Sequence, residues 1–255
     1  MPTIIACFKW VVDEAYIRRG SSGELDFSSV DYKISDYDRN AIEEAVRLKE
    51  TLGGSAIAVT VGAPAASRGV KDALSRGTDQ AWFASDDTFG HLDSSRTAAI
   101  LAEIIRSRIG QYDLIICGEG SGDLYAQQVG PRLAENLRIP CISFVQKVTI
   151  SENRLIADRK TEEGIEVIAA PLPALVTVLP DINSPRIPGV KDTLMAGKKP
   201  AVTIKNDELQ PAGKVLLQTI RFVASRMERD CERFGTDTAE IAKFVGSLRK
   251  KGVIG

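Results

Sequence analysis

A glycine-rich segment near the middle of the chain carries the residues best suited to hold a phosphate. Gly118, Gly120 and Gly122 alternate with other residues, directly after an apolar run at 113–117 and ahead of a helical pattern at 127–137. Glycines let backbone N–H groups approach a ligand closely, and the N-terminus of a helix favours negative charge. The segment therefore predicts either a phosphate site or a tight strand-to-helix connection that binds nothing.

The spacing of this segment excludes two familiar phosphate-binding motifs. No Gly-Lys-Ser or Gly-Lys-Thr closes it, as the phosphate loop of NTPases requires. Asp123 occupies the position of the third glycine in the dinucleotide fingerprint. Because two anions repel, we expect Asp123 to cap the following helix, or to accept a hydrogen bond from a ribose or ribityl hydroxyl, rather than to touch phosphate.

The overall composition is that of a charge-balanced globular protein. The 255 residues are enough to bury the core of one large α/β domain, or of a domain with an extension. A net charge of −1 with scattered Lys and Arg gives no sign of a nucleic-acid partner. No apolar run approaches the roughly 20 residues of a membrane span, and the first residues lack the basic region of a signal peptide. We therefore expect no membrane insertion.

Cysteine and histidine give no sign of a metal or nucleophilic site. Cys7, Cys117, Cys141 and Cys231 are far apart, and three of them lie in or beside predicted strands. Reduced structural thiols are therefore favoured over disulfides or metal ligands, which is consistent with a cytoplasmic location. His91, the single histidine, falls in a polar stretch and is expected to be a solvated loop residue.

Short apolar runs alternate with helical patterns through the first part of the chain. Strands are predicted at 4–12, 56–61, 80–84, 113–117 and 141–144. Helices are predicted between them at 40–52, 65–75, 95–107 and 127–137. In the first helix one face collects Ala41, Ile42, Ala45, Val46 and Leu48, and in the third helix one face collects Ala98, Leu101, Ala102 and Ile105. This alternation predicts an α/β fold with a mostly parallel sheet covered by helices on both faces.

A different pattern begins after residue 145. Antiparallel strands are predicted at 145–150, 154–159 and 166–169, followed by a buried strand at 175–178. Prolines then interrupt the segment up to residue 200, which is not expected to form long regular elements. An amphipathic helix at 237–251 places Ile241, Phe244, Val245 and Leu248 on one face. We therefore divide the chain into a nucleotide-binding domain at 1–200, which includes the hairpin, and a C-terminal arm at 201–255.

Five motifs in order resemble the beta (small) subunit of electron transfer flavoproteins. They are the strand at 4–9 and the segments 41–50, 128–135, 172–177 and 183–186. The variant at 118–130 is most similar to a bacterial subgroup tied to anaerobic carnitine (crotonobetainyl-CoA) reduction and related fixation-type electron chains. The resemblance implies a three-layer α/β/α, flavodoxin-like domain with an antiparallel hairpin extension, and a C-terminal arm that packs on the alpha subunit.

The same resemblance implies an electron carrier subunit rather than an enzyme with its own substrate chemistry. In such heterodimers the alpha subunit holds the main FAD, and the beta subunit buries AMP or, in electron-bifurcating members, a second FAD. Electrons pass between flavin dehydrogenases of the acyl-CoA or enoyl-CoA type and other redox partners. Which of the two nucleotides this chain would bind stays open at this point.

Carried over onto this chain, the resemblance implies a nucleotide site built from four segments. Backbone amides at 120–123 and 127–129 would hold the phosphate, and Ser121 and Gln127 could add side-chain hydrogen bonds. This agrees with the rule that ligands of open parallel sheets bind beyond the carboxyl ends of the strands. The residues implied to surround the nucleotide are Cys7, Phe8, Ser35, Asp36, Tyr37, Asp38, Val61, Gly118, Glu119, Gly120, Ser121, Gly122, Asp123, Tyr125, Ala126, Gln127, Gln128 and Val129.

The segment 183–200 corresponds to the family's recognition loop, which docks on acyl-CoA-type dehydrogenases through an apolar anchor. Val190 lies at the anchor position, and Leu194 or Met195 could serve instead. The alternative is a proline-rich surface connection with incidental aliphatic residues, since exposed apolar loop residues are common.

Two other classes of function fit an α/β nucleotide-binding chain. An adenylate-binding hydrolase or ligase would need a lysine or a metal-binding acid cluster near the loop, and the sequence offers only Glu119 and Asp123 there. A nucleotide-sensing protein of the universal-stress type would be the other class, but the length of the chain and its hairpin extension argue against it.

Overall fold

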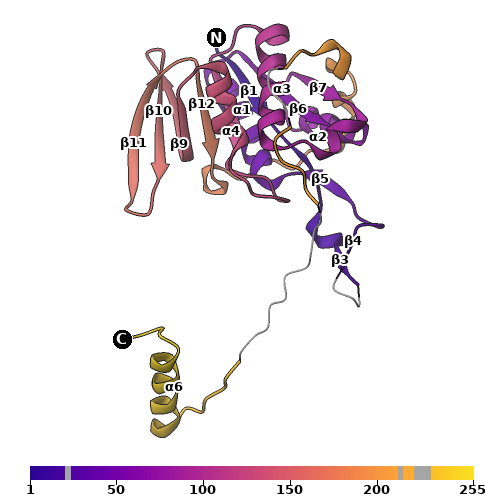
Figure 1. Cartoon of the computed structure of the whole chain (residues 1–255). Coiled ribbons are helices and arrows are strands. Elements are labelled where there is room, and N and C mark those ends of the chain that lie inside the picture. The colour runs from indigo at the N-terminus through magenta and orange to yellow at the C-terminus, as the bar shows by residue number, and fades with distance from the viewer. Residues whose placement is uncertain (21–23, 212–214, 221–230) are drawn as a thin grey trace.

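A nine-stranded sheet forms the centre of the part of the chain that the computed structural model describes, which is residues 1–20, 24–211, 215–220 and 231–255. The strands follow the order β11-β10-β9-β12-β8-β1-β6-β7-β13 (Figure 1). Neighbours from β9 to β13 in this order are parallel, whereas β10 and β11 form an antiparallel extension at one edge. The strands are β1 (Thr3–Cys7), β6 (Ser55–Gly62), β7 (Gln80–Ser85), β8 (Leu114–Gly118), β9 (Cys141–Ser151), β10 (Arg154–Lys160), β11 (Ile165–Pro171), β12 (Ala174–Val178) and β13 (Ala201–Lys205).

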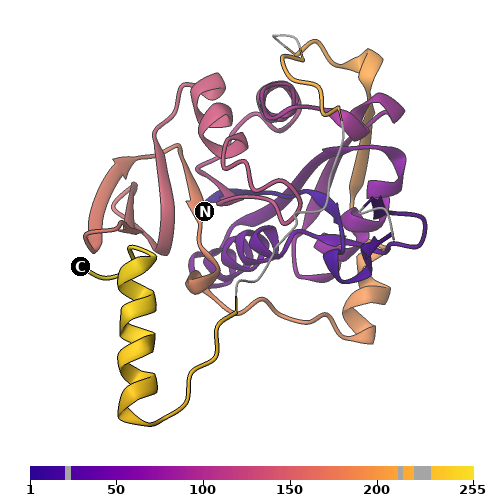
Figure 2. The same cartoon turned by 60° about the horizontal axis from the view of Figure 1, so that its bottom comes forward.

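Helices cover both faces of the sheet. One face carries α1 (Asp36–Leu52), α2 (Ser67–Ser75) and α5 (Val190–Ala196), and the other carries α3 (Ser94–Ile104) and α4 (Val129–Leu137). Figure 2 shows the sheet nearly edge-on, between α3 and α4 on one side and α1 on the other. Alternate residues of β1 serve the two cores, Ile4 and Ala6 on the α1 side and Ile5 and Cys7 on the α3 side. The predicted three-layer α/β/α fold with a mostly parallel sheet is confirmed.

The apolar faces predicted for the first and third helices are confirmed. Ala41, Ile42, Ala45 and Val46 are fully buried, and Leu48 is nearly so. Ala98, Leu101, Ala102 and Ile105 are buried in the opposite core, although the α-helix passes at Ile105 into a π-helical turn (Ile105–Ile109).

The predicted strand at 4–12 is wrong as one element. β1 ends at Cys7, and the chain then leaves the sheet to form β2 (Trp10–Val12), which pairs with β5 (Tyr32–Ile34) in a separate two-stranded sheet. Both backbone groups of Lys9 bond to the start of α1: its N–H donates to Asp38 and its C=O accepts from Ser35. These two bonds replace the pairing that would have continued the sheet.

Two further strands depart from the predicted pattern. The segments predicted at 141–144 and 145–150 form one strand, β9, which pairs with β12 in parallel and with β10 in antiparallel orientation. Phe144, with a φ of 60°, marks the irregularity between these two pairings. β13 was not predicted: it begins directly after Pro200 and adds an edge strand beside β7, so residues 201–205 belong to the central sheet.

Short elements complete the described chain. Arg18–Arg19 (β3) and Leu25–Asp26 (β4) pair beyond β2 and β5, next to the single turn η1 (Glu14–Tyr16). The other 3₁₀ turns are η2 (Pro64–Ala66), η3 (Asp87–His91), η5 (Pro180–Ile182) and η6 (Asn206–Glu208). His91 ends η3 and is exposed, as predicted.

The last helix, α6 (Thr238–Lys250), stands away from the α/β body in Figure 1. It buries none of its residues; Ile241 and Phe244 of its predicted apolar face are exposed, and Val245 and Leu248 are half-buried. The ring of Phe244 packs against Phe234, with centroids 5.4 Å apart. Residues 212–214 and 221–230 of the predicted arm lie outside the described residues. Within the described ranges, no helix is both long enough and apolar enough to cross a membrane.

A topological switch point lies between β1 and β8. From β1 the chain proceeds to β6 and β7 on one side, and then returns to β8 on the other side of β1. The helices that follow β1 and β8, α1 and α4, therefore lie on opposite faces of the sheet, and open parallel sheets bind ligands at such a point. We call this position, beside Lys9, Asp38 and Gly118, the crevice.

Candidate functional site

Asp38 joins the ends of the two strands that flank the switch point. Its Oδ2 accepts the backbone N–H of Lys9 at 2.8 Å, and its Oδ1 accepts the N–H of Gly118 at 3.2 Å. Lys9 follows β1 and Gly118 ends β8, so one side chain of α1 fixes both walls of the crevice. Burial raises the pKa of Asp38 to about 7, although the two amides and the Lys9 charge favour its ionised form.

Gly118 is required by this close approach. A Cβ atom at that position would lie 2.6 Å from Asp38 Oδ1 and 2.8 Å from the backbone carbonyl carbon of Tyr37. Gly120 is constrained differently, because its Cβ would meet the ring of Tyr125 at 2.6 Å. A Cβ at Gly122 would meet nothing within 4 Å. The three alternating glycines are therefore not equivalent.

The loop between β8 and α4 is folded back over the start of α1. Ser35 Oγ accepts the N–H of Gly122 at 3.2 Å, and the rings of Tyr37 and Tyr125 lie 5.2 Å apart. The Tyr125 hydroxyl donates a hydrogen bond to Glu119, and this bond, together with burial, raises the pKa of Tyr125 to about 12. Tyr125 and Gln127 both adopt the left-handed region, with φ of 45° and 57°. Such conformations are costly for non-glycine residues and cluster at ligand-binding loops.

Lys9 forms an ion pair with Asp123, Nζ to Oδ2 at 2.5 Å. Burial by itself would raise the pKa of Asp123, but the Lys9 charge and hydrogen bonds lower it below its usual value. The predicted capping role of Asp123 is wrong, because α4 begins only at Val129 and Gln128 occupies its N-cap position. Lys9 was not among the site residues predicted from the sequence. Its position at the end of the first strand, where ligands of parallel sheets bind, could have indicated it. The crevice therefore holds a cation that an anionic ligand could share with Asp123.

The N-terminus of α4 follows the glycine-rich loop that leaves β8. Gln128 makes no side-chain capping hydrogen bond, and the first N–H groups of a helix have no partner within it. Gly130 allows the helix to approach the sheet closely, since a Cβ there would lie 2.5 Å from Cγ2 of Thr177. Uncapped amides, the positive end of a helix dipole and the Lys9 ammonium group fit a phosphate group.

The structure brings most of the predicted site residues to this crevice. Cys7 and Phe8 are buried at the end of β1, and Ser35, Tyr37 and Asp38 contact the loop. The loop itself presents Gly118, Glu119, Gly120, Ser121, Gly122, Asp123, Tyr125, Ala126, Gln127, Gln128 and Val129.

Two predicted site residues stand apart from this loop cluster. Asp36 is exposed and pairs with Lys33 and Arg39, both at 2.9 Å, instead of contacting the loop. Val61 lies near the end of β6 and packs into the α3-side core.

The cysteines at the crevice floor are poorly suited to nucleophilic chemistry. A contact with Cys7 and burial raise the pKa of the Cys117 thiol well above its usual value. A thiol rather than a thiolate is therefore favoured, and thiols are weak nucleophiles. Cys141 is exposed at the start of β9, so its predicted association with a strand is confirmed without burial.

The predicted docking residues lie on an exposed helical turn. Val190 begins α5 and is 81% exposed, while Leu194 and Met195 are 71% and 46% exposed. Ala196 is the residue through which α5 enters the core. The segment 183–200 is thus not an irregular connection throughout, because it contains a short helix with its apolar side chains in solvent.

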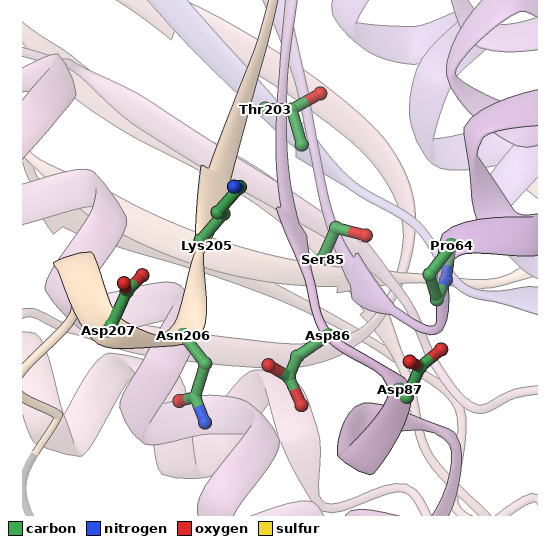
Figure 3. A pocket seen from close by; sticks show the side chains of 8 residues that line it. All are labelled: Pro64, Ser85, Asp86, Asp87, Thr203, Lys205, Asn206 and Asp207. Carbon is green, nitrogen blue, oxygen red and sulfur yellow. The ribbon is translucent and has the colours of Figure 1, made fainter.

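A separate cavity of about 600 Å³ lies at the ends of β7 and β13, away from the switch point (Figure 3). Its lining consists of Pro64, Ser85, Asp86, Asp87, Thr203, Lys205, Asn206 and Asp207. Three carboxylates against one lysine do not favour a phosphate. The crevice beside Asp38 also holds more carboxylates than lysines, but each carboxylate there has a partner: Asp38 accepts two backbone amides, Glu119 accepts the Tyr125 hydroxyl, and Asp123 pairs with Lys9. The crevice is the better candidate for an anionic nucleotide because it adds the uncapped amides of α4.

A comparison with models of protein families covers most of the chain. The model of the electron transfer flavoprotein domain matches residues 23–209. The match spans α1, the glycine-rich loop, α4, the antiparallel extension and β13. More than half of the chain is therefore covered, including Asp38, the glycine-rich loop and the segment that carries α5, whereas β1 and Lys9 precede the matched residues.

Proposed function

This chain belongs to the electron transfer flavoprotein domain family, and we propose that it is the beta subunit of a heterodimeric electron transfer flavoprotein. The observation that carries the proposal is the crevice at the switch point, where Asp38 joins two strand ends beneath an uncapped helix N-terminus. A bound adenine nucleotide, AMP or a second FAD, would place its phosphate there. We propose that the chain belongs to the carnitine-reduction and fixation-type subgroup, on the residues at 118–130.

The residues of this chain would bind and orient a nucleotide rather than turn over a substrate. Flavin, when bound, supplies the redox chemistry, and the protein sets its position and electrostatic surroundings. Amides of the loop and of α4 would hold the phosphate, and Lys9 would balance its charge while paired with Asp123. Tyr37 and Tyr125 supply ring surface beside the loop.

The proposal is tested by releasing the nucleotides of the purified complex with denaturant and identifying them by chromatography. We expect an adenine nucleotide in addition to the main FAD of the alpha subunit. AMP as the additional nucleotide indicates a simple carrier, whereas FAD indicates a bifurcating role. A complex without any additional adenine nucleotide would reject the assignment of the crevice.

We further propose that the two exposed apolar parts of this chain contact two different proteins. The α6 face, with Ile241 and Phe244 in solvent, would pack on the alpha subunit as a C-terminal arm. Val190, with Leu194 and Met195, would dock on an acyl-CoA-type dehydrogenase. Electron transfer in the cytoplasm between that dehydrogenase and other redox partners would then be the role of the heterodimer.

The substitution Val190→Asp is expected to lower the rate of electron transfer from an acyl-CoA dehydrogenase at least about tenfold, because a carboxylate cannot enter an apolar pocket on the partner. Flavin content should stay unchanged. Val167→Asp is the matched control, since Val167 is also exposed, at 71%, but lies on β11. Equal transfer rates for the Val190→Asp variant and the wild type would rule out Val190 as the anchor.

A further inference from the structure

The segment that precedes α5 is held by buried polar side chains of α1. Asn40, Glu43 and Glu44 are at most 8% exposed. Asn40 Nδ2 donates to the carbonyl of Asn183 at 2.9 Å, and Asn183 Nδ2 donates to Glu44 Oε2 at 3.0 Å. Polar groups are rarely buried without partners, and here the partners come from a segment about 140 residues away. Helix α1 therefore serves as the base on which residues 183–186 are fixed.

Arg186 is the strongest of these attachments. Its Nε and its backbone N–H both donate to Glu43 Oε2, at 2.8 and 3.0 Å, and its Nη1 donates to Glu50 at 2.8 Å. Arg76, the C-cap residue of α2, donates to the carbonyl of Arg186 at 3.0 Å. Burial would raise the pKa of Glu43, but the hydrogen bonds from Arg186 lower it below its usual value. Both the side chain and the backbone of Arg186 are thus fixed.

Lys199 fixes the other end of the segment. Its Nζ donates to the carbonyls of Leu74 and Thr78, at 2.8 and 2.6 Å, at the C-terminal end of α2. Burial lowers the pKa of Lys199, which also lies near Lys49. Lys199 is therefore an anchor of the segment rather than a solvated surface lysine.

The residues between the two anchors have little packing of their own. Ile187 is 92% exposed, directly after Arg186, and Val190 and Leu194 are also largely in solvent. Val190 and Leu194 are four residues apart and lie on the same side of α5, whereas Ile187 lies in the extended segment that leads into the helix. Exposed charges on α2 and α5 are mainly positive, namely Arg68, Lys71 and Lys191 against Asp192. The surface fits a partner protein that offers an apolar pocket rimmed by carboxylates.

We propose that Arg186 and Lys199 preset the segment 187–198 for docking, with Arg186 as a positioning residue and Ile187 as a contact residue beside Val190. The docking part of this inference rests on the proposed function. Segments that are ordered before binding lose less conformational entropy when they bind. Because α5 buries little, the anchors at its two ends supply the order that its own packing does not.

Hydrogen exchange of the full chain, followed by mass spectrometry, tests the anchors without any partner. Arg186→Gln should speed hydrogen exchange across 187–198 by about tenfold, because local opening of this segment becomes easier. The milder variants Arg186→Lys and Glu50→Gln should speed it by less. Arg106→Gln is the matched control, since Arg106 donates to Asn136 on the other side of the sheet. Unchanged exchange in 187–198 for all three variants would overturn the proposal.

A double-mutant cycle tests the docking role, with a purified acyl-CoA dehydrogenase as the probe. Arg186→Gln is expected to raise the KM for the carrier about tenfold at constant kcat, and to add little when Val190→Asp or Ile187→Asp is already present. Additive effects, or an unchanged KM despite faster exchange, would overturn the positioning role. A wild-type protein that accepts no electrons from the dehydrogenase would count against the proposed function, whereas the exchange measurement still decides on the anchors.

Discussion

Replacing Gly118 with alanine is expected to weaken nucleotide binding by at least about tenfold and to lower the free energy of unfolding by about 1–3 kcal/mol. The added Cβ would lie 2.6 Å from Asp38 Oδ1 and 2.8 Å from the backbone of Tyr37. The backbone of α1 at Tyr37 cannot move aside as a flexible side chain could. To make room for the added Cβ, β8 or the Asp38 side chain must therefore move. Either movement breaks the bond through which Asp38 joins the two strand ends. Calorimetric titration of the stripped protein with AMP, together with denaturant unfolding, measures both effects.

The same loop supplies the control for this prediction. A Cβ at Gly122 meets nothing within 4 Å, so Gly122→Ala should change stability by less than about 0.5 kcal/mol and leave AMP affinity intact. Gly120→Ala should fall between the two, because the obstructing Tyr125 ring is a side chain that can rotate. Equal losses for the variants at 118 and 122 would show that backbone flexibility, and not the approach of Asp38, is what the glycines provide.

The glycine-rich loop shows how far the sequence could lead. Its position after a buried strand and before a helix was predictable from apolar runs and glycines, and so was the α/β class of the fold. The unequal roles of Gly118 and Gly122 were not predictable, because they depend on how close α1 comes to each. That distance is set by tertiary packing and has no local signal in the sequence.

The errors in the predicted elements have the same origin. The strand predicted at 4–12 looked continuous because its residues are apolar, but the backbone of Lys9 is bonded to Ser35 and Asp38. β13 was missed because the prolines before it suggested an irregular tail, whereas β7 offered an open edge for pairing. In both cases a distant partner decided the outcome. The burial of Glu43, through Arg186, is a third example.

The ion pair between Lys9 and Asp123 helps to decide between the roles predicted for Asp123. Repulsion between anions argues against direct contact of Asp123 with phosphate, and this stays a prediction. The expected helix cap failed because the loop continues for several residues before α4 begins at Val129. A hydroxyl acceptor with a neighbouring cation fits the crevice, since Lys9 can face the anion while Asp123 faces a sugar.

Between pH values near 4 and 7, Asp38 is expected to make the protein less stable as the pH rises. The pKa of Asp38 is about 7 in the native protein, against 3.8 for the same carboxyl group in the unfolded chain. In this range the native state holds a proton that the unfolded state lacks, so raising the pH favours unfolding. The pKa difference corresponds to a loss of at most about 4 kcal/mol in the free energy of unfolding. This loss is reached near pH 7 and is constant above it. Urea unfolding of the nucleotide-free chain across this range measures the contribution.

Comparison with Asp38→Asn isolates this contribution from other carboxyl groups. Hydrogen bonds or charges lower the pKa of Glu43, Asp93 and Asp123, and their stabilisation is lost as the pH falls, which has the opposite sign. The asparagine would turn an N–H group toward one of the two amides, a cost that does not vary with pH. As the pH rises from about 4 to 7, the free energy of unfolding of the wild type should therefore fall relative to that of the Asp38→Asn variant. Asp36→Asn, in the same turn of α1 but exposed, controls for the loss of a carboxyl group. Parallel curves for wild type and Asp38→Asn would mean that the Lys9 and Gly118 amides compensate for burial, and that Asp38 joins the two strands as a permanently charged group.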